Sequence, residues 1–205
     1  MRGAVVLSGG ASQRLRRDKG LALLQGKPLV TWVSEAATRV AGEVVVVVSR
    51  RQNRHSYVQV LPEGVKVVCD ELDLQSPLVG MLTGFSTIRS EYVSVVSCDQ
   101  PFTSPQVLEY LFRVAEGFDC AVPRWPDGKA EFLQAVYRVC PAKLAAQRAL
   151  AEGELRSLAV VKRLAKVQYV KTDELRRFDR SLVTFFNVNT QEDLLKAEKL
   201  FRTAP

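Results

Sequence analysis

Five consecutive valines, Val44–Val48, constrain the fold of this 205-residue chain more than any other feature. β-Branched residues favour strands, and a run with no polar residue indicates a strand that is buried on both faces. Three further runs are almost as apolar, namely Gly3–Leu7, Val65–Val68 and Tyr92–Val96. Strands of this kind occur in parallel sheets that helices cover on both sides. The first half of the chain is therefore predicted to build such a sheet.

Segments with a helical spacing of apolar residues lie between these strands. We expect helices at Pro28–Ala41, Pro77–Arg89 and Pro105–Glu116. Ser76 and Ser104 directly precede the second and third helix, a pattern typical of a serine N-cap with proline in the first turn. The resulting βαβαβ order predicts an α/β fold of three layers, with an open, mostly parallel sheet and right-handed crossovers.

The second half of the chain predicts a more mixed arrangement. Strands are expected at Phe118–Val122, Glu131–Val139, Val167–Val170 and Leu182–Phe186, and helices at Pro141–Glu152 and from Gln191 to about Phe201, the last one capped at Thr190. No linker, internal repeat or low-complexity segment separates the two halves. Residues 1–205 are therefore expected to form a single domain.

The segment Leu7–Gly20 follows the first predicted strand and carries the clearest chemistry. Gly9 and Gly10 let the backbone turn tightly and approach a ligand, while Arg14 and Lys19 bring positive charge to the same segment. Backbone N–H groups surrounded by cations suit a phosphate. The glycine spacing matches neither a P-loop nor a dinucleotide-binding fingerprint. We therefore predict another kind of phosphate loop, in which the two cations neutralise a triphosphate and the leaving pyrophosphate.

Polar residues also follow the other predicted strands. Asp99 ends a buried strand and is a natural Mg²⁺ ligand beside a phosphate loop, although a turn or capping Asp gives the same pattern. Asp70 is expected to hold a ribose hydroxyl or a base amine, to assist the metal, or only to begin a loop. Asn187 and Asn189 suit either a second polar substrate or plain turn chemistry. These residues converge only if the sheet order brings their strands together.

The bulk composition excludes several classes of protein. The net charge is +7 and the pI is about 9.4, but the basic residues are dispersed and lack interleaved aromatic residues, so a nucleic-acid partner is not expected. A positive field that attracts polyphosphates explains the same charge. Four cysteines without a C-x-x-C pair are expected to be buried thiols, and one histidine excludes a multi-histidine zinc site. Without a transmembrane-length run or a signal pattern, a cytoplasmic protein with no membrane partner is expected.

Five motifs follow one another along the chain: Leu-x-Gly-Gly-x-Ser-x-Arg with Asp18-Lys19-Gly20, Gly26-Lys27-Pro28-Leu29, Ser76-Pro77-Leu78-Val79-Gly80-Met81, Cys98-Asp99-Gln100-Pro101-Phe102 and Asn187-Val188-Asn189-Thr190-Gln191-Glu192-Asp193-Leu194. Together they resemble the molybdenum cofactor guanylyltransferases, which are MobA-like nucleotidyltransferases. The resemblance covers nearly the whole chain. It implies a Rossmann-like nucleotidyltransferase fold with a mixed second half.

The resemblance also implies a reaction and its participants. The phosphate of molybdopterin-bound molybdenum cofactor would attack the α-phosphorus of GTP and release pyrophosphate, with Mg²⁺ as the metal and carrier or acceptor proteins as further partners. The implied nucleotide contacts are Leu7, Ser8, Gly9, Gly10, Lys19, Asp70 and Asp99, with Arg14, Lys19 and Asp99 as catalytic residues and Asp99 as the metal ligand. Asn187, Asn189 and Arg156 would face the pterin substrate.

Three segments depart from the usual pattern of this family. Leu15-Arg16 stands where the family usually has Met-Gly, and an Asn often found after the second strand is not matched at Ser49-Arg50. Glu131-Phe132-Leu133-Gln134 replaces a sequence that usually contains proline. Two alternative functions remain open at this point. One is a sister nucleotidyltransferase that uses CTP or a sugar 1-phosphate, and the other is a non-catalytic partner that only binds a nucleotide.

Overall fold

The computed structural model describes residues 1–8, 11–12, 17–70, 72 and 74–203. Its main sheet has seven strands in the order β11-β9-β10-β8-β1-β6-β7. These strands are β1 Arg2–Leu7, β6 Glu43–Val48, β7 Lys66–Cys69, β8 Tyr92–Ser97, β9 Cys120–Arg124, β10 Gln134–Arg138 and β11 Val167–Lys171. The four apolar runs of the first half thus form the four neighbouring strands β8, β1, β6 and β7, which confirms the predicted sheet.

The strand directions decide which loops meet at one edge of the sheet. β1 pairs in parallel with both β6 and β8, and β7 continues the parallel arrangement beside β6. Among the described strands of this sheet, β10 runs against its neighbours β8 and β9, while β11 is parallel to β9. The sheet is therefore mostly parallel, and the carboxyl ends of its parallel strands meet the start of β10 at one edge.

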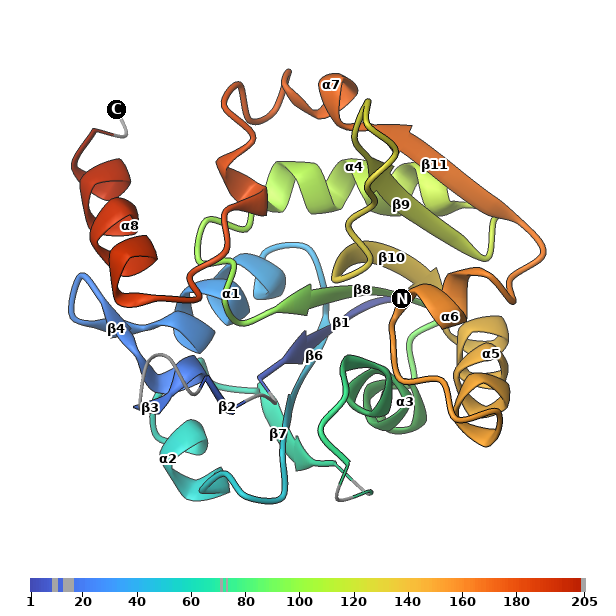
Figure 1. Ribbon diagram of the computed structural model, residues 1–205, viewed down its shortest axis with the longest axis horizontal. Helices are drawn as coiled ribbons and strands as arrows, with labels where there is room; N and C mark the ends of the chain where they lie inside the picture. The colour runs from blue at the N-terminus through green and yellow to red at the C-terminus, as the bar shows by residue number, and fades with distance from the viewer. Residues whose placement is uncertain (9–10, 13–16, 71, 73, 204–205) are drawn as a thin grey trace.

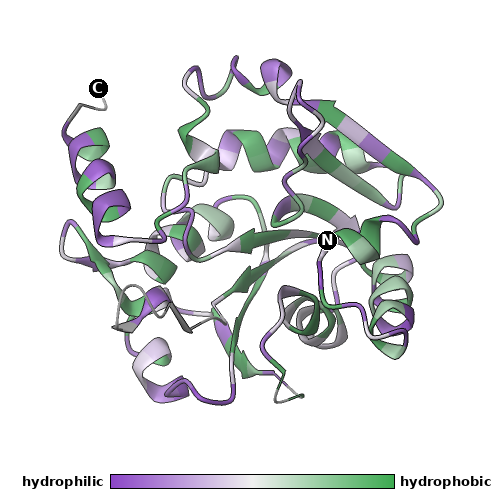
Figure 2. Ribbon diagram, in the orientation of Figure 1, coloured by the Kyte–Doolittle hydropathy of each residue, from purple (hydrophilic) through white to green (hydrophobic). Residues whose placement is uncertain are grey.

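Helices cover both faces of this sheet, as Figure 1 shows. Helices α3 (Pro77–Thr87) and α5 (Val139–Ala151) pack on one face, and α1 (Leu29–Thr38) and α4 (Pro105–Ala115) pack on the other. Successive side chains of β1 alternate between the faces, so that Val5 joins the core beneath α3 and Val6 joins the core beneath α1. In Figure 2 the central strands are accordingly mostly hydrophobic.

The predicted helix caps are present. Ser76 Oγ accepts a hydrogen bond from Leu78 N at 3.1 Å, and Ser104 Oγ accepts one from Val107 N at 3.3 Å. Helix α8 (Gln191–Thr203) begins after Thr190, whose Oγ1 accepts from Asp193 N at 3.1 Å. The Asp193 carboxylate accepts from Thr190 N in return, which completes a capping box.

The prediction of a strand at Leu182–Phe186 was wrong. Val183–Phe185 form a 3₁₀ helix, η2, and Leu182 adopts a left-handed conformation with φ of 54°. The physical reason is a set of local and long-range side-chain bonds at Thr184. Thr184 N donates to Asp179 Oδ2, and Thr184 Oγ1 accepts from Ser104 N. The first bond satisfies the backbone N–H that a strand would have paired in a sheet ladder, and the second fixes the Thr184 side chain against Ser104.

Several element boundaries also differ from the predictions. β9 and β10 begin at Cys120 and Gln134, later than expected, and α5 begins at Val139, earlier than expected. Some short elements were not predicted: β2 Ala11–Ser12, β3 Arg17–Asp18, η1 Lys19–Leu21, β4 Leu23–Leu24, β5 Lys27–Pro28, α2 Arg54–Val58, α6 Leu158–Val161 and α7 Thr172–Leu175. Two of the four cysteines, Cys69 and Cys140, are exposed rather than buried.

Within the described part of the chain, each helix is too short or too polar to cross a lipid bilayer.

Candidate active site

The carboxyl ends of β1 and β8 lie side by side and carry the residues that the sequence singled out. Ser8 follows β1 and its N–H donates to Val47 O at 2.8 Å, which extends the pairing with β6. Cys98 follows β8 and its N–H donates to Leu7 O at 2.9 Å. Asp99 therefore lies beside the end of β1, where Leu7 and Ser8 begin the segment Leu7–Gly20. The strand order therefore brings the polar ends of β1 and β8 together, which is the condition for the predicted site residues to converge.

Lys19 is the centre of a charged cluster at this edge. Its Nζ lies 2.5 Å from Asp99 Oδ2 and 2.6 Å from Asn189 Oδ1. The side chains of Lys19 and Asp99 are only 15% and 13% exposed, so water screens this ion pair weakly. Three residues that were predicted independently, from three distant segments of the chain, are thus in direct contact.

Asp99 retains one carboxylate oxygen for a further ligand. Asp99 Oδ2 accepts from Lys19, whereas Asp99 Oδ1 is buried and has no hydrogen-bond partner among the described residues. A carboxylate oxygen is the ligand that Mg²⁺ prefers. The described residues hold no group of three or more His, Cys, Asp or Glu side chains suited to a metal. The residues present therefore fit a Mg²⁺ ion that one carboxylate shares with substrate oxygens and water.

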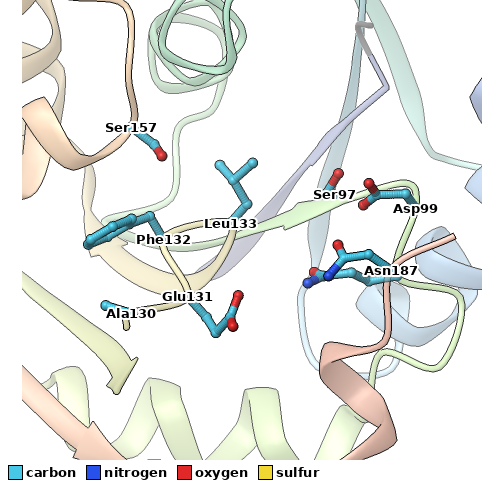
Figure 3. Close-up of a pocket in the computed structure, with 9 residues that line it drawn as sticks. Ser97, Asp99, Ala130, Glu131, Phe132, Leu133, Ser157 and Asn187 are labelled. Carbon is cyan, nitrogen blue, oxygen red and sulfur yellow. The ribbon is translucent and has the colours of Figure 1, made fainter. Parts of the chain in front are cut away.

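A cavity of about 200 Å³ opens beside Asp99 (Figure 3). Asn187 lies next to Asp99 on one side of it, the loop Ala130–Leu133 lies opposite, and Ser157 borders the far end. Because β10 is antiparallel to β8, the start of β10 lies at the same edge as the end of β8, and this places the loop over the cavity. Residues 131–133 were expected at the start of a strand, so their place beside the cavity was not predicted from the sequence.

Polar contacts between Glu131 and residues just before the loop hold the loop Ala130–Leu133 in place beside the cavity. Glu131 Oε1 accepts a hydrogen bond from Trp125 Nε1 at 2.7 Å and lies 3.6 Å from Lys129 Nζ. Trp125 in turn packs edge-on against Phe185, with ring centroids 5.5 Å apart. In Figure 3 the Glu131 carboxylate points toward Asn187. The cavity is therefore bounded by polar groups on both sides, as a polar substrate requires.

The two asparagines of the C-terminal motif have different partners. Val188 N donates to Asp99 O at 2.8 Å, which ties the motif to the end of β8. Asn187 Nδ2 donates to Phe185 O at 3.0 Å, while Asn189 accepts from Lys19. Only Asn187 of the pair lines the cavity. Arg156 is exposed and is absent from the cavity lining, although the neighbouring Ser157 belongs to it.

Asp70 lies at the carboxyl end of β7 and is 6% exposed. A Cβ added at Gly80 would lie 3.8 Å from Asp70 Oδ1 and 3.1 Å from Leu7 Cδ2, so Asp70 is packed against α3 near the end of β1. Burial raises the pKa of Asp70 to about 6, although a hydrogen bond with Thr83 lowers it in part. Asp70 Oδ1 has no partner among the described residues, which suits an acceptor for a nucleoside hydroxyl or amine.

The raised pKa of Asp70 predicts a pH-dependent stability difference. The folded protein binds this proton more tightly than the unfolded chain, whose Asp pKa is about 3.8, so the free energy of unfolding falls as the pH rises from 4 through 6. Asp70→Asn removes this dependence. The stability of Asp70→Asn relative to the parent protein should therefore increase by about 2 kcal/mol between pH 4 and pH 7. Urea unfolding of both proteins at both pH values measures this change. If the stability difference between Asp70→Asn and the parent protein were the same at pH 4 and pH 7, the raised pKa of Asp70 would be refuted.

Three predicted residues of the nucleotide site, Gly9, Gly10 and Arg14, lie outside the described residues. Their roles stay predictions. Ser8 and Leu7 are described, and they lie where the sequence placed them, at the end of β1.

Comparison with known proteins decides the family. The sequence profile of the MobA-like NTP transferase domain matches residues 4–167. The chain belongs to this family. A probable molybdenum cofactor guanylyltransferase of Methanosarcina mazei is 34% identical over 200 residues, covering 94% of this chain and 88% of the relative. This MobA-like transferase is therefore an enzyme that acts as a nucleotidyltransferase in molybdenum cofactor biosynthesis, and the resemblance drawn from the sequence motifs is confirmed.

Solved structures agree with this assignment. The molybdopterin-guanine dinucleotide biosynthesis protein A of Archaeoglobus fulgidus superposes with a TM-score of 0.84 at 29% identity, covering 98% of this chain and all of the other. A 2-C-methyl-D-erythritol 4-phosphate cytidylyltransferase of Thermus thermophilus superposes with a TM-score of 0.72 at 17% identity, covering 99% of this chain and 100% of that one. The nucleotidyltransferase fold is confirmed, and its presence in a cytidylyltransferase means that the fold alone does not select the base.

Proposed function

We propose that this MobA-like transferase moves GMP from GTP to the phosphate of molybdopterin-bound molybdenum cofactor. An oxygen of the cofactor phosphate forms a bond to the α-phosphorus of GTP, the bond from that phosphorus to the bridging oxygen breaks, and pyrophosphate leaves. The observation that carries this proposal is the contact of Lys19 with both Asp99 and Asn189 beside a polar cavity. Through this contact Lys19, the expected phosphate-binding cation, touches both Asp99, the expected metal ligand, and Asn189, an expected contact of the acceptor.

The nucleotide half of the proposed site is built on the end of β1. Backbone groups of Leu7, Ser8, Gly9 and Gly10 contact GTP. Lys19 and Arg14 neutralise its phosphates and stabilise the charge that develops on the leaving pyrophosphate. Lys19 reaches the phosphates by exchanging its contact with Asp99 for one with the nucleotide. Asp70 binds the nucleoside.

Asp99 is the proposed Mg²⁺ ligand, and its unpartnered Oδ1 supports this role. When bound, Mg²⁺ neutralises phosphate charge and orients the triphosphate. With Mg²⁺ bound, Asp99 would keep a cation as its partner when Lys19 turns to the nucleotide.

The acceptor half of the proposed site is the cavity between Asn187 and the loop Ala130–Leu133. Asn187 contacts the pterin substrate inside this cavity, and Asn189 and Arg156 contact the part of the substrate that extends beyond it. A phosphate monoester is already ionised near neutral pH, so the nucleophile needs no strong general base. We therefore propose a direct in-line transfer without a covalent enzyme intermediate, in which positioning and charge supply most of the rate enhancement. We further propose that residues 1–205 act as one domain in the cytoplasm, with carrier or acceptor proteins for the cofactor.

A thermal-shift measurement with GTP, CTP, UTP and ATP, each with and without Mg²⁺, tests the nucleotide assignment. A ligand that binds only the folded state raises the melting temperature by mass action. A rise that is selective for GTP and larger with Mg²⁺ is expected. A preference for CTP or UTP would instead support a sister nucleotidyltransferase. GTP binding without pyrophosphate release in the presence of the acceptor would indicate a non-catalytic nucleotide-binding protein.

A further inference from the structure

Tyr57 lies on the short helix α2 and is fully buried, yet its hydroxyl is surrounded by polar groups. Ser8 Oγ donates a hydrogen bond to the Tyr57 hydroxyl at 2.9 Å. The Tyr57 hydroxyl donates to Asp18 Oδ1 at 2.6 Å. Ser8 follows β1, and Asp18 directly precedes Lys19. One phenol group therefore joins the two residues that flank positions 9–17 of the segment Leu7–Gly20.

Gln52 reinforces the same junction. Gln52 Oε1 accepts from Ser49 N at 2.7 Å, which fixes the orientation of the amide. Gln52 Nε2 then lies 2.8 Å from each of three acceptors, which are Ser8 O, Asp18 Oδ1 and the Tyr57 hydroxyl. Its two N–H groups are shared among these acceptors. Two side chains that follow β6 thus hold both ends of the segment.

Gly20 shows how tightly this junction is packed. A Cβ at Gly20 would overlap Ser8 Oγ and would lie 2.6 Å from the Tyr57 hydroxyl oxygen. Gly20 N also donates to Asp18 Oδ1 at 3.2 Å. The absence of a side chain at Gly20 therefore lets the end of the segment approach its beginning. Asp18 Oδ1 receives three donors in this arrangement, from Tyr57, Gln52 and Gly20, so its position is strongly determined.

We propose that Tyr57, with Gln52, is a positioning residue for nucleotidyl transfer, which clamps the two ends of the phosphate-binding segment and thereby holds Lys19 at the carboxyl ends of β1 and β8, where the triphosphate would bind. The clamp acts through Asp18, because Asp18 is the immediate neighbour of Lys19 and caps the 3₁₀ helix that Lys19 begins. This inference rests on the proposed function, since it takes the segment Leu7–Gly20 as the binding site for the triphosphate.

The electrostatics of the buried phenol agree with this role. Burial raises the pKa of Tyr57 far above its ordinary value, and the neighbouring Asp18 carboxylate raises it further. The hydroxyl therefore keeps its proton through the neutral range and remains a donor to Asp18. A hydrogen bond to a carboxylate is stronger than one between neutral groups, and it is stronger still in a buried position.

Tyr57→Phe tests the clamp because it removes one hydroxyl and keeps the ring that packs in the core. Amide hydrogen exchange of the free protein should become faster at Ser8 and Gly20. The dissociation constant for GTP with Mg²⁺ should rise about tenfold, because the ends of the segment would then have to be ordered when the nucleotide binds. Tyr92→Phe is the matched control. It removes a hydroxyl that makes two hydrogen bonds of 3.3 Å at the opposite edge of the sheet, and it should change neither quantity.

A double-mutant cycle separates positioning from a merely structural role. If Tyr57 acts through Lys19, Tyr57→Phe should weaken GTP binding much less in a Lys19→Met background than in the parent protein. Additive effects, or a lower melting temperature with an unchanged GTP affinity, would overturn the inference. Gln52→Met provides a second, independent disruption of the clamp and should give the same pattern. A parent protein that binds no nucleoside triphosphate would refute the proposed function, whereas the exchange measurement needs no nucleotide and tests the clamp by itself.

Discussion

Asp99→Asn is expected to lower kcat for pyrophosphate release by about a thousandfold, the scale seen when one electrostatic group is removed from an active site. The substitution removes a negative charge and keeps the shape of the side chain. The amide oxygen still accepts from Lys19, so the fold is retained, but a neutral oxygen is a much weaker ligand for Mg²⁺. Steady-state pyrophosphate release at saturating GTP and acceptor measures the loss.

The control for this prediction is Asp173→Asn. Asp173 is an exposed residue of helix α7, where its carboxylate pairs with Arg176 at 3.1 Å. This variant changes the net charge by the same amount and should keep full activity. If Asp99→Asn retained the parent kcat and the parent dependence on Mg²⁺, Asp99 would not be the metal ligand.

Lys19→Met is expected to lower kcat/KM for GTP by about a hundredfold or more. The ammonium group is lost from a site where it is only 15% exposed, and charge-assisted interactions are strong in such surroundings. The loss includes weaker binding of the triphosphate and weaker stabilisation of the leaving pyrophosphate, so both KM and kcat should change. Initial rates of pyrophosphate release over a range of GTP concentrations separate the two.

A second lysine provides the matched control for Lys19. Lys66 begins β7 at the opposite edge of the sheet, where its side chain is 61% exposed and lies 3.9 Å from Glu43. Lys66→Met should leave kcat/KM unchanged within a factor of about two, because an exposed surface ion pair contributes little. Equal losses in the two variants would show that the general positive field, rather than Lys19 itself, attracts the nucleotide.

Much of the fold could be predicted from the sequence, because local signals and packing agree in the first half of the chain. The valine run at 44–48 has to be buried on both faces, and Ser76 and Ser104 mark the starts of two helices. The predicted polar ends of β1 and β8 are neighbours, which explains why Lys19 and Asp99 meet. Asn189 joins them because the capping box at Thr190 fixes the turn before the last helix.

The remainder depended on tertiary contacts that leave no local pattern. Residues 182–186 are apolar enough for a strand, yet the bonds of Thr184 to Asp179 and Ser104 select a 3₁₀ helix. The loop Ala130–Leu133 faces the cavity only because β10 is antiparallel to β8. The residues of a strand do not show whether it will pair in a parallel or an antiparallel direction. The contacts of Tyr57 with Ser8 and Asp18 join segments that are far apart in the sequence, so no local pattern around Tyr57 predicted them.

The most direct test of the proposed function is the release of pyrophosphate in the presence of molybdopterin-bound molybdenum cofactor and each of the four nucleoside triphosphates, with mass analysis of the product. We expect release only when GTP and the cofactor are present together, and a product that has gained the mass of GMP minus water. Faster release with CTP, or a product without the added nucleotide, would contradict guanylyl transfer by this chain.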